Sequence, residues 1–167
     1  MGECLPPGVS ALPARVRLMF RGADAARAAA DAVLGLTLPR EACRTTSALG
    51  IDALWLGPDE WLLLTDHTVP PRLAAALEAH PHALVDISHR QAAWQVAGRN
   101  AVTLLNAGCP LDLHPHAFPP GACTRTLLGK VEIVLWRIAP ENFQIEIGRS
   151  FIPYVLAFLR EAARDLP

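Results

Sequence analysis

The chain has 167 residues, of which 51% are hydrophobic and 19% are charged, and its formal net charge is −1. This length is enough for one domain, or two small intertwined halves, with a real core. A net charge near zero argues against nucleic-acid binding, and no apolar run approaches the roughly 20 residues of a membrane-spanning helix. Residues 1–10 lack the pattern of a signal peptide, and the four cysteines lie far apart. We therefore expect a cytoplasmic protein with free thiols and no membrane contact.

The first half of the chain predicts strands and two helices. Residues 1–13 hold three prolines and little periodicity, so we expect a flexible leader. Apolar residues then alternate with arginines over Arg15–Arg21, which predicts a half-buried strand. Asp24 is expected to be the N-cap of a helix over Ala25–Leu34, which Gly35 ends. A helix from Pro70 to about His80 closes this half. Three short strands are expected between the helices: Thr45–Leu49, Ile51–Leu56 and Trp61–Leu64.

The same order of elements returns in the second half, after a strand over Ala83–Ser88 and a tight reversal at His89–Arg90. The repeated elements are a strand over Ala92–Ala97, a helix over Asn100–Ala107, strands over Val131–Ile138 and Phe143–Ile147, and a helix over Phe151–Ala163. Two pseudo-repeats, about 14–82 and 83–167, are therefore expected to form a single domain over residues 14–167. We predict an α+β fold with a mainly antiparallel sheet built from both halves and helices packed on it.

Three neighbouring residues, Asp86, Ser88 and His89, are of the types found in hydrolytic triads. Strand alternation places Asp86 and Ser88 on one face and His89 on the other, so they cannot converge locally. The sequence also lacks a G-x-S-x-G elbow, a glycine-rich phosphate loop and paired carboxylates for acid–base catalysis. We interpret the three residues as polar groups that cap a turn, and we expect no catalytic site.

A metal site could be sought at Cys109, His114, His116 and Cys123. Their spacing, C-x₄-H-x-H with one distant cysteine, is not a standard zinc pattern. A loop ordered by prolines is the better interpretation, and we predict no metal site.

The run GCPLDLHPHAFPPG at residues 108–121 is long, apolar and stiffened by prolines. Loops of this length are usually functional or disordered, and this one is too apolar to be disordered. A rigid loop with exposed aliphatic groups suits docking to another protein. The residues predicted to contact a partner are Leu111, Leu113, His114, Phe118 and Arg90.

Several runs resemble the gamma subunits of heterotetrameric sarcosine oxidases: VDISHR at 85–90, GCPLDLHP at 108–115, TLLGK at 126–130 with Trp136-Arg137, and WLGPDEWL at 55–62. The resemblance covers nearly the whole chain after the leader. More distantly, residues 86–89, Gly98 and the spacing of Gly121, Gly129 and Arg137 resemble the folate-binding domain of glycine-cleavage aminomethyltransferases. That relationship implies a duplicated α+β fold.

The first resemblance implies an accessory, non-catalytic subunit of a complex that oxidises sarcosine to glycine and passes the one-carbon unit to tetrahydrofolate. The implied partners are the alpha, beta and delta subunits. In that family the alpha subunit contains the FAD, NAD and folate sites, the beta subunit covalent FMN and the amine site, and the delta subunit zinc. The gamma subunit has no recognised cofactor, so we expect none in this chain.

A second hypothesis is a stand-alone folate-binding module that resembles the aminomethyltransferases. That family has an acidic pair in the strand leading to a Tyr-Arg, whereas Val131–Arg137 offers only Glu132. Glu132 and Arg137 are thus the candidate folate residues, and they would have to face one pocket. A third hypothesis is a folate-sensing or RNA-associated relative. The K-G-C-x-x-G-Q-E motif of tRNA-modification relatives is absent, which argues against nucleic-acid binding.

Overall fold

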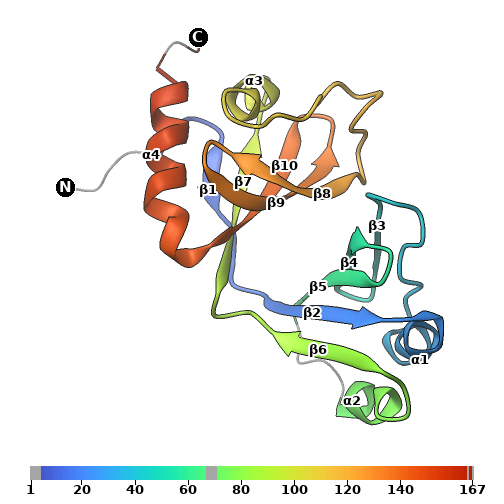
Figure 1. Ribbon diagram of the computed structural model, residues 1–167. Helices are drawn as coiled ribbons and strands as arrows, with labels where there is room; N and C mark the ends of the chain where they lie inside the picture. Colours follow the sequence, from blue (N-terminus) through green and yellow to red (C-terminus); the bar gives the residue numbers. More distant parts are fainter. Residues whose placement is uncertain (1–4, 67–70, 165, 167) are drawn as a thin grey trace. The chain divides into compact units, whose positions relative to one another are not determined.

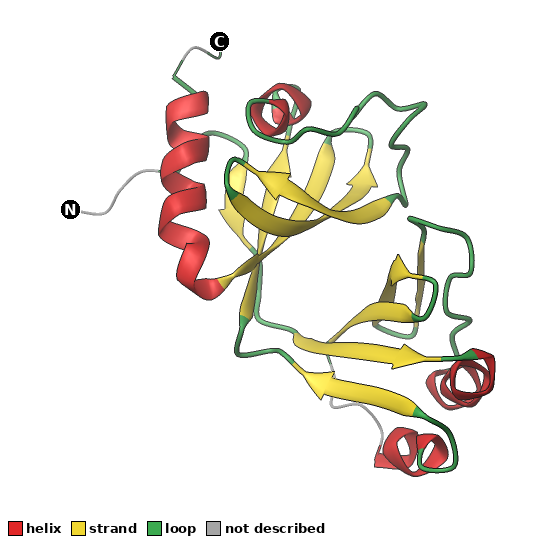
Figure 2. Ribbon diagram, viewed as in Figure 1, coloured by secondary structure: helices red, strands yellow, loops and turns green. Residues whose placement is uncertain are grey.

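The computed structural model describes residues 5–66, 71–164 and 166. The chain divides into two compact units, Arg15–His89 and a unit that joins Met1–Ala14 to Arg90–Pro167 (Figure 1). No helix in the described ranges has the length and apolarity that a bilayer crossing requires. Within the described residues, each unit combines one antiparallel sheet with two α-helices, so the predicted α+β class is confirmed (Figure 2).

The unit Arg15–His89 is built on a five-stranded sheet in the order β3-β4-β5-β2-β6. Phe20 stacks on Trp61 with ring centroids 5.6 Å apart, and both rings lie in a core that helix residues complete. The elements of this unit are β2 (Val16–Gly22), α1 (Asp24–Leu34), β3 (Thr45–Ala48), β4 (Ile51–Gly57), β5 (Glu60–Thr65), α2 (Pro71–Leu77) and β6 (His82–Asp86).

The ends of helix α1 correct one prediction and confirm another. Ala23, not Asp24, is the N-cap, and its extended backbone (ψ −179°) has no side-chain cap. Asp24 is the first helical residue, where its carboxylate lies 2.8 Å from Arg27 Nη2 and suits the positive end of the helix dipole. Gly35 ends the helix in the left-handed region at φ 64°, as predicted. The helix expected from Pro70 begins at Pro71; Pro70 lies outside the described residues.

The second unit has a five-stranded sheet in the order β1-β7-β10-β9-β8. Its core lies between one face of this sheet and the helices, with Val96, Leu105, Phe143 and Val155 among its fully buried side chains. The elements of this unit are β1 (Val9–Ala11), β7 (Gln91–Ala97), α3 (Ala101–Asn106), β8 (Cys123–Leu128), β9 (Val131–Ala139), β10 (Asn142–Gly148), the 3₁₀ turn η1 (Arg149–Phe151) and α4 (Ile152–Ala162).

The two sheets have the same strand order, because β8-β9-β10-β7-β1 matches β3-β4-β5-β2-β6 position by position. The prediction of one sheet from both halves is therefore wrong in this detail, since each half forms its own. β1 directly precedes β2 in the chain but pairs with β7, and β6 directly precedes β7 but pairs with β2. The two halves have thus exchanged the strand at one edge of each sheet. The units consequently divide at residues 89 and 90, and part of the expected leader forms a strand.

Candidate functional site

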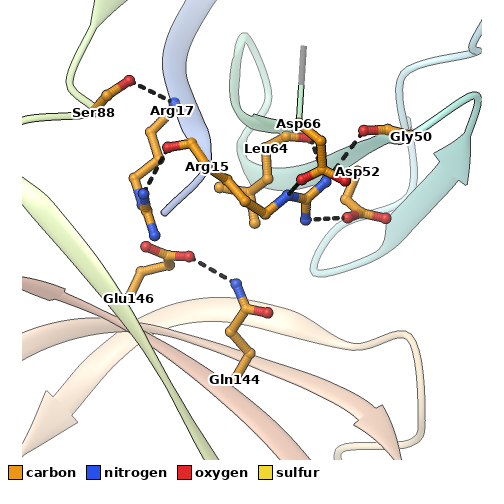
Figure 3. Close-up of polar contacts among 9 residues, drawn as sticks. All are labelled: Arg15, Arg17, Gly50, Asp52, Leu64, Asp66, Ser88, Gln144 and Glu146. Carbon is orange, nitrogen blue, oxygen red and sulfur yellow. Dashed lines mark hydrogen bonds and ion pairs between the residues drawn. The ribbon is translucent and has the colours of Figure 1, made fainter. Parts of the chain in front are cut away.

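The turn after β6 joins Asp86, Ser88 and the start of β2; Figure 3 shows Ser88 beside Arg17. The Ser88 amide donates to Asp86 Oδ1 at 2.8 Å, and Ser88 Oγ accepts the Arg17 amide at 2.9 Å. Hydrogen bonds from the Ser88 side chain and backbone lower the pKa of the exposed Asp86 carboxyl. The predicted turn-capping role is thus confirmed for Asp86 and Ser88, because both side chains accept backbone amides.

Arg15 makes a polar cluster that sequence reasoning missed (Figure 3). Its Nη1 lies 2.6 Å from Asp52 Oδ2 and its Nε lies 2.6 Å from Asp66 Oδ1. Nη2 donates to the carbonyls of Leu64 and Gly50 at 3.1 and 3.2 Å. The cluster ties the start of β2 to β4 and β5 through ion pairs to two carboxylates and bonds to two backbone carbonyls.

Arg137 lies near the end of β9 and is only 2% exposed. Its Nη1 donates to the carbonyls of Leu113 at 2.9 Å and Phe118 at 2.7 Å, and its Nη2 donates to the carbonyl of Pro140 at 2.5 Å. The guanidinium carbon lies 4.9 Å from the centroid of the Phe143 ring, which fits a cation–π contact. Burial lowers the pKa of the guanidinium, but arginine remains charged near neutral pH.

Glu132 and Arg137 do not face one pocket. They are five positions apart on β9, and the register to β8 and β10 is regular between them, so they lie on opposite faces of the sheet. Glu132 is exposed, whereas Arg137 is enclosed by backbone carbonyls and an aromatic ring. The geometry that the folate hypothesis requires is therefore missing.

The loop between α3 and β8 turns part of its apolar surface inward. Leu113 is fully buried and Phe118 is 5% exposed, and both belong to the core of their unit. This corrects the expectation that their side chains are exposed on the loop. Leu111 is half-buried, and His114 and Arg90 are exposed, so only these three of the predicted contact residues offer side chains to a partner.

The four residues considered for a metal site take separate positions. Cys109 is buried, with Sγ 3.7 Å from Thr126 Oγ1, and Cys123 is fully buried. The exposed rings of His114 and His116 stack with centroids 5.2 Å apart. Nδ1 of His114 accepts the His116 amide at 3.3 Å, which leaves its Nε2 to carry the proton when the ring is neutral. The histidines thus order the turn.

A hollow of about 390 Å³ lies over the connector between α1 and β3. Several of the polar groups that line the hollow form ion pairs or hydrogen bonds with other residues of the connector. Arg44 Nε lies 3.1 Å from Glu41 Oε1, and Thr46 Oγ1 donates to the Thr37 carbonyl at 2.7 Å. The hollow therefore has no set of convergent free groups of the kind that fixes a small ligand.

A buried polar pair that sequence reasoning missed lies on β10 (Figure 3). Gln144 and Glu146 are two residues apart, so they share the sheet face opposite Phe143 and Ile145. Gln144 Nε2 donates to Glu146 Oε1 at 2.7 Å, and both side chains are buried. The signal in the sequence was the alternation of polar and apolar residues in NFQIEIG, which is typical of a strand with two unlike faces.

Two curated relatives support one family. The chain is 32% identical over 145 residues to the sarcosine oxidase subunit gamma of an Arthrobacter species, covering 85% of this chain and 71% of the relative. It is 31% identical over 161 residues to the subunit gamma of Corynebacterium sp. strain P-1, covering 95% and 75%.

Solved structures agree on the fold. A chain of the heterotetrameric sarcosine oxidase from Corynebacterium sp. U-96, in complex with pyrrole 2-carboxylate, matches with a TM-score of 0.87 and 28% identity. That match covers 93% of this chain and 82% of the other. The glycine cleavage system aminomethyltransferase T of Bartonella henselae matches with a TM-score of 0.65 and 14% identity, over 95% of this chain and 49% of the other. This second match confirms the resemblance in fold to the aminomethyltransferases.

The family assignment rests on most of the chain, and no single motif decides it. The sequence model of the sarcosine oxidase, gamma subunit family matches residues 21–165, which include every described element except β1 and the first residues of β2. The resemblance noted in the sequence is therefore confirmed, and the chain belongs to the sarcosine oxidase gamma subunit family.

Proposed function

We propose that this chain is an accessory, non-catalytic subunit of a heterotetrameric sarcosine oxidase that oxidatively demethylates sarcosine to glycine. The observation that supports this most directly is the match at a TM-score of 0.87 to a chain of such an enzyme. The polar side chains that the sequence offered for chemistry, Ser88 and Arg137, are engaged by backbone groups of the same chain. Such bonds support turns and loops, and they leave little capacity for a substrate.

The partners in this proposal are the alpha, beta and delta subunits. FAD, FMN, NAD, tetrahydrofolate and zinc would be bound by those subunits and not by this chain. The described cysteines, Cys43, Cys109 and Cys123, are free thiols, which fits assembly in the reducing cytoplasm.

We further propose that the surface around the loop between α3 and β8 contacts a partner subunit. The exposed residues available there are Leu111 in part and His114, and Arg90 is exposed directly before β7. Interfaces of lasting complexes combine apolar contacts with a polar rim, and this set has both kinds of side chain.

The test is an assay of the isolated chain. Purified alone, the chain should show no absorbance of a bound flavin and no turnover of sarcosine. Co-expression with the other subunits of the enzyme should give a flavin-containing complex that includes this chain. Sarcosine turnover by the chain alone would contradict the proposal.

The stand-alone folate module is a less favoured function, since Glu132 and Arg137 lie on opposite faces of the sheet. Calorimetric titration of the isolated chain with tetrahydrofolate distinguishes the two. We expect no binding heat above dilution. Saturable binding that Glu132→Gln weakens would instead support a folate site on this chain.

A further inference from the structure

The unit Arg15–His89 is one unbroken stretch of chain, whereas the other unit is not. The five strands of its sheet, β2 to β6, all lie within this stretch. The other unit takes β1 from before the stretch and its remaining described elements from after it. The unit Arg15–His89 is therefore an insert between β1 and its partner β7, and its own sheet is complete without a strand from elsewhere.

The two ends of this insert are hydrogen-bonded to each other. The Ile87 amide donates to the Arg17 carbonyl at 2.8 Å, and Ser88 Oγ accepts the Arg17 amide at 2.9 Å (Figure 3). These bonds extend the pairing of β2 with β6, in which Leu18 lies opposite Asp86. We call Arg17, Ile87 and Ser88 the clasp. Because of the clasp, the chain enters and leaves the folded insert at neighbouring points.

The pairing of β1 with β7 closes a long loop. Ser10 lies opposite Gln95, and the two residues are 85 positions apart in the chain. The contact between Arg17 and Ser88 bypasses 71 of these 85 positions, which leaves 14. The probability of loop closure falls roughly as the 3/2 power of loop length, so the clasp favours the pairing about 15-fold.

Strand β1 has few contacts with which to offset the entropy of a long loop. It consists of three residues, of which only Val9 is buried. Two backbone bonds flank it: the Ala97 amide donates to the Gly8 carbonyl at 2.8 Å, and the Leu12 amide donates to the Ala93 carbonyl at 3.0 Å. So short a strand depends strongly on how closely the chain already holds it to its partner.

We propose that the clasp is a positioning device that fixes the order of folding. The insert Arg15–His89 folds first, its joined ends then bring β1 beside β7, and the sheet that contains β1 is completed last. This order follows the general rule that contacts across short loops form before contacts across long ones. The inference concerns the chain itself and does not depend on the proposed function.

Two matched insertions into the full chain test the clasp. Each adds a flexible segment of about 20 glycine and serine residues, which exposed positions tolerate. One is placed between Pro13 and Ala14, outside the clasp, and the other between Arg40 and Glu41, inside the insert; all four residues are exposed.

Hydrogen exchange of the amides of Leu12 and Ala97 reports the pairing of β1, since both amides donate to carbonyls across it. The insertion at Pro13 lengthens the loop that remains outside the clasp, so it should lower the protection of these amides about fourfold. The insertion at Arg40 lies in the part that the clasp bypasses and should leave their protection unchanged. If the insert were not closed at its ends, both insertions would lower protection equally, by less than about twofold.

The order of folding is measured on the unaltered chain, so it can be tested even if an insertion prevents folding. Pulsed hydrogen exchange during refolding should show the amides that pair β2 with β5 and β6 protected before those of Leu12 and Ala97. Equal effects of the two insertions, or protection of the Ala97 amide before the amides of β2, would overturn the proposal. Neither measurement requires another subunit, so the result is independent of whether the chain assembles into a sarcosine oxidase.

Discussion

Single side chains bonded to backbone atoms fix two of the irregular segments of this protein, the connector after α1 and the loop before β8. Trp61 Nε1 donates to the Pro39 carbonyl at 2.9 Å, and Asp31 Oδ1 accepts the Leu38 amide at 2.8 Å, so both hold the connector after α1. Arg137 does the same for the loop before β8. Since buried polar groups are stable only when they are hydrogen-bonded, these contacts explain why polar residues occur in a largely apolar interior.

The carboxyl of Asp86 provides a test at the level of a single residue. We expect an NMR titration to give a pKa below the usual 3.8, and Ser88→Ala to raise it, because the hydrogen bonds from Ser88 favour the ionised form. A carboxyl whose pKa is lower in the folded state adds stability that is complete above its unfolded pKa and is lost as the pH falls through the folded pKa. Ser88→Ala should therefore reduce stability more at neutral pH than in strong acid, where only the loss of the Arg17 amide bond to Ser88 Oγ remains. An unchanged Asp86 pKa in Ser88→Ala would contradict this.

The packing of helix α4 depends on a close approach of the chain at Gly108. A Cβ there would lie 2.7 Å from the Gly129 amide nitrogen and 2.5 Å from the Phe158 ring, whereas a Cβ at Gly98 would meet nothing within 4 Å. Gly98 instead has a φ of 100°, which only glycine adopts readily.

Two alanine substitutions separate these effects. Gly108→Ala should destabilise the protein by about 1–3 kcal/mol through the steric conflict, and should disturb the near-ultraviolet signal of the stacked Tyr154 and Phe158. Gly98→Ala should cost about 1 kcal/mol or more through backbone strain alone and should leave that signal intact. Chemical denaturation and circular dichroism measure both. A Gly108→Ala protein as stable as the wild type would show that the approach is looser than described.

Most secondary structure could be predicted from the sequence, because alternation and turn residues are local signals. Arg15–Arg21 and Gly35 are examples: the strand and the helix stop lie where expected. Strand β1 could not be predicted, since Val9–Ala11 is too short for alternation to stand out, and its partner β7 lies more than 80 residues away. The division into two sheets was also hidden, because pairing depends on which distant edges are available.

Strand β1 yields a test at the level of the element. Val9 is 5% exposed and packs into the core, and backbone hydrogen bonds flank it, from Ala97 N to Gly8 O and from Leu12 N to Ala93 O. Removing residues through Leu12 should cost about 2–4 kcal/mol and promote aggregation, because it uncovers the edge of β7. Denaturation and light scattering would measure this. As a control, Ser10→Ala, at an exposed position of the same strand, should change stability by less than about 0.5 kcal/mol. A truncated chain as stable as the full chain would refute the structural role of β1.

At the scale of the whole molecule, the sequence predicted the family and the duplication better than it predicted the site. The repeat is visible because both halves use the same order of elements. The inward turn of Leu113 and Phe118 was not visible, because it depends on Arg137, 24 and 19 positions away along the chain. The sequence alone could not tell that this arginine serves the loop and not a ligand.

The family assignment is the main support for the proposal that this chain is a subunit of a larger enzyme. The direct measurement is affinity purification of the tagged chain from the cells that naturally produce it, followed by a visible absorbance spectrum of the eluate. We predict that the other subunits of a sarcosine oxidase co-elute in fixed proportion with a flavin spectrum. A colourless chain that elutes alone would contradict the accessory role.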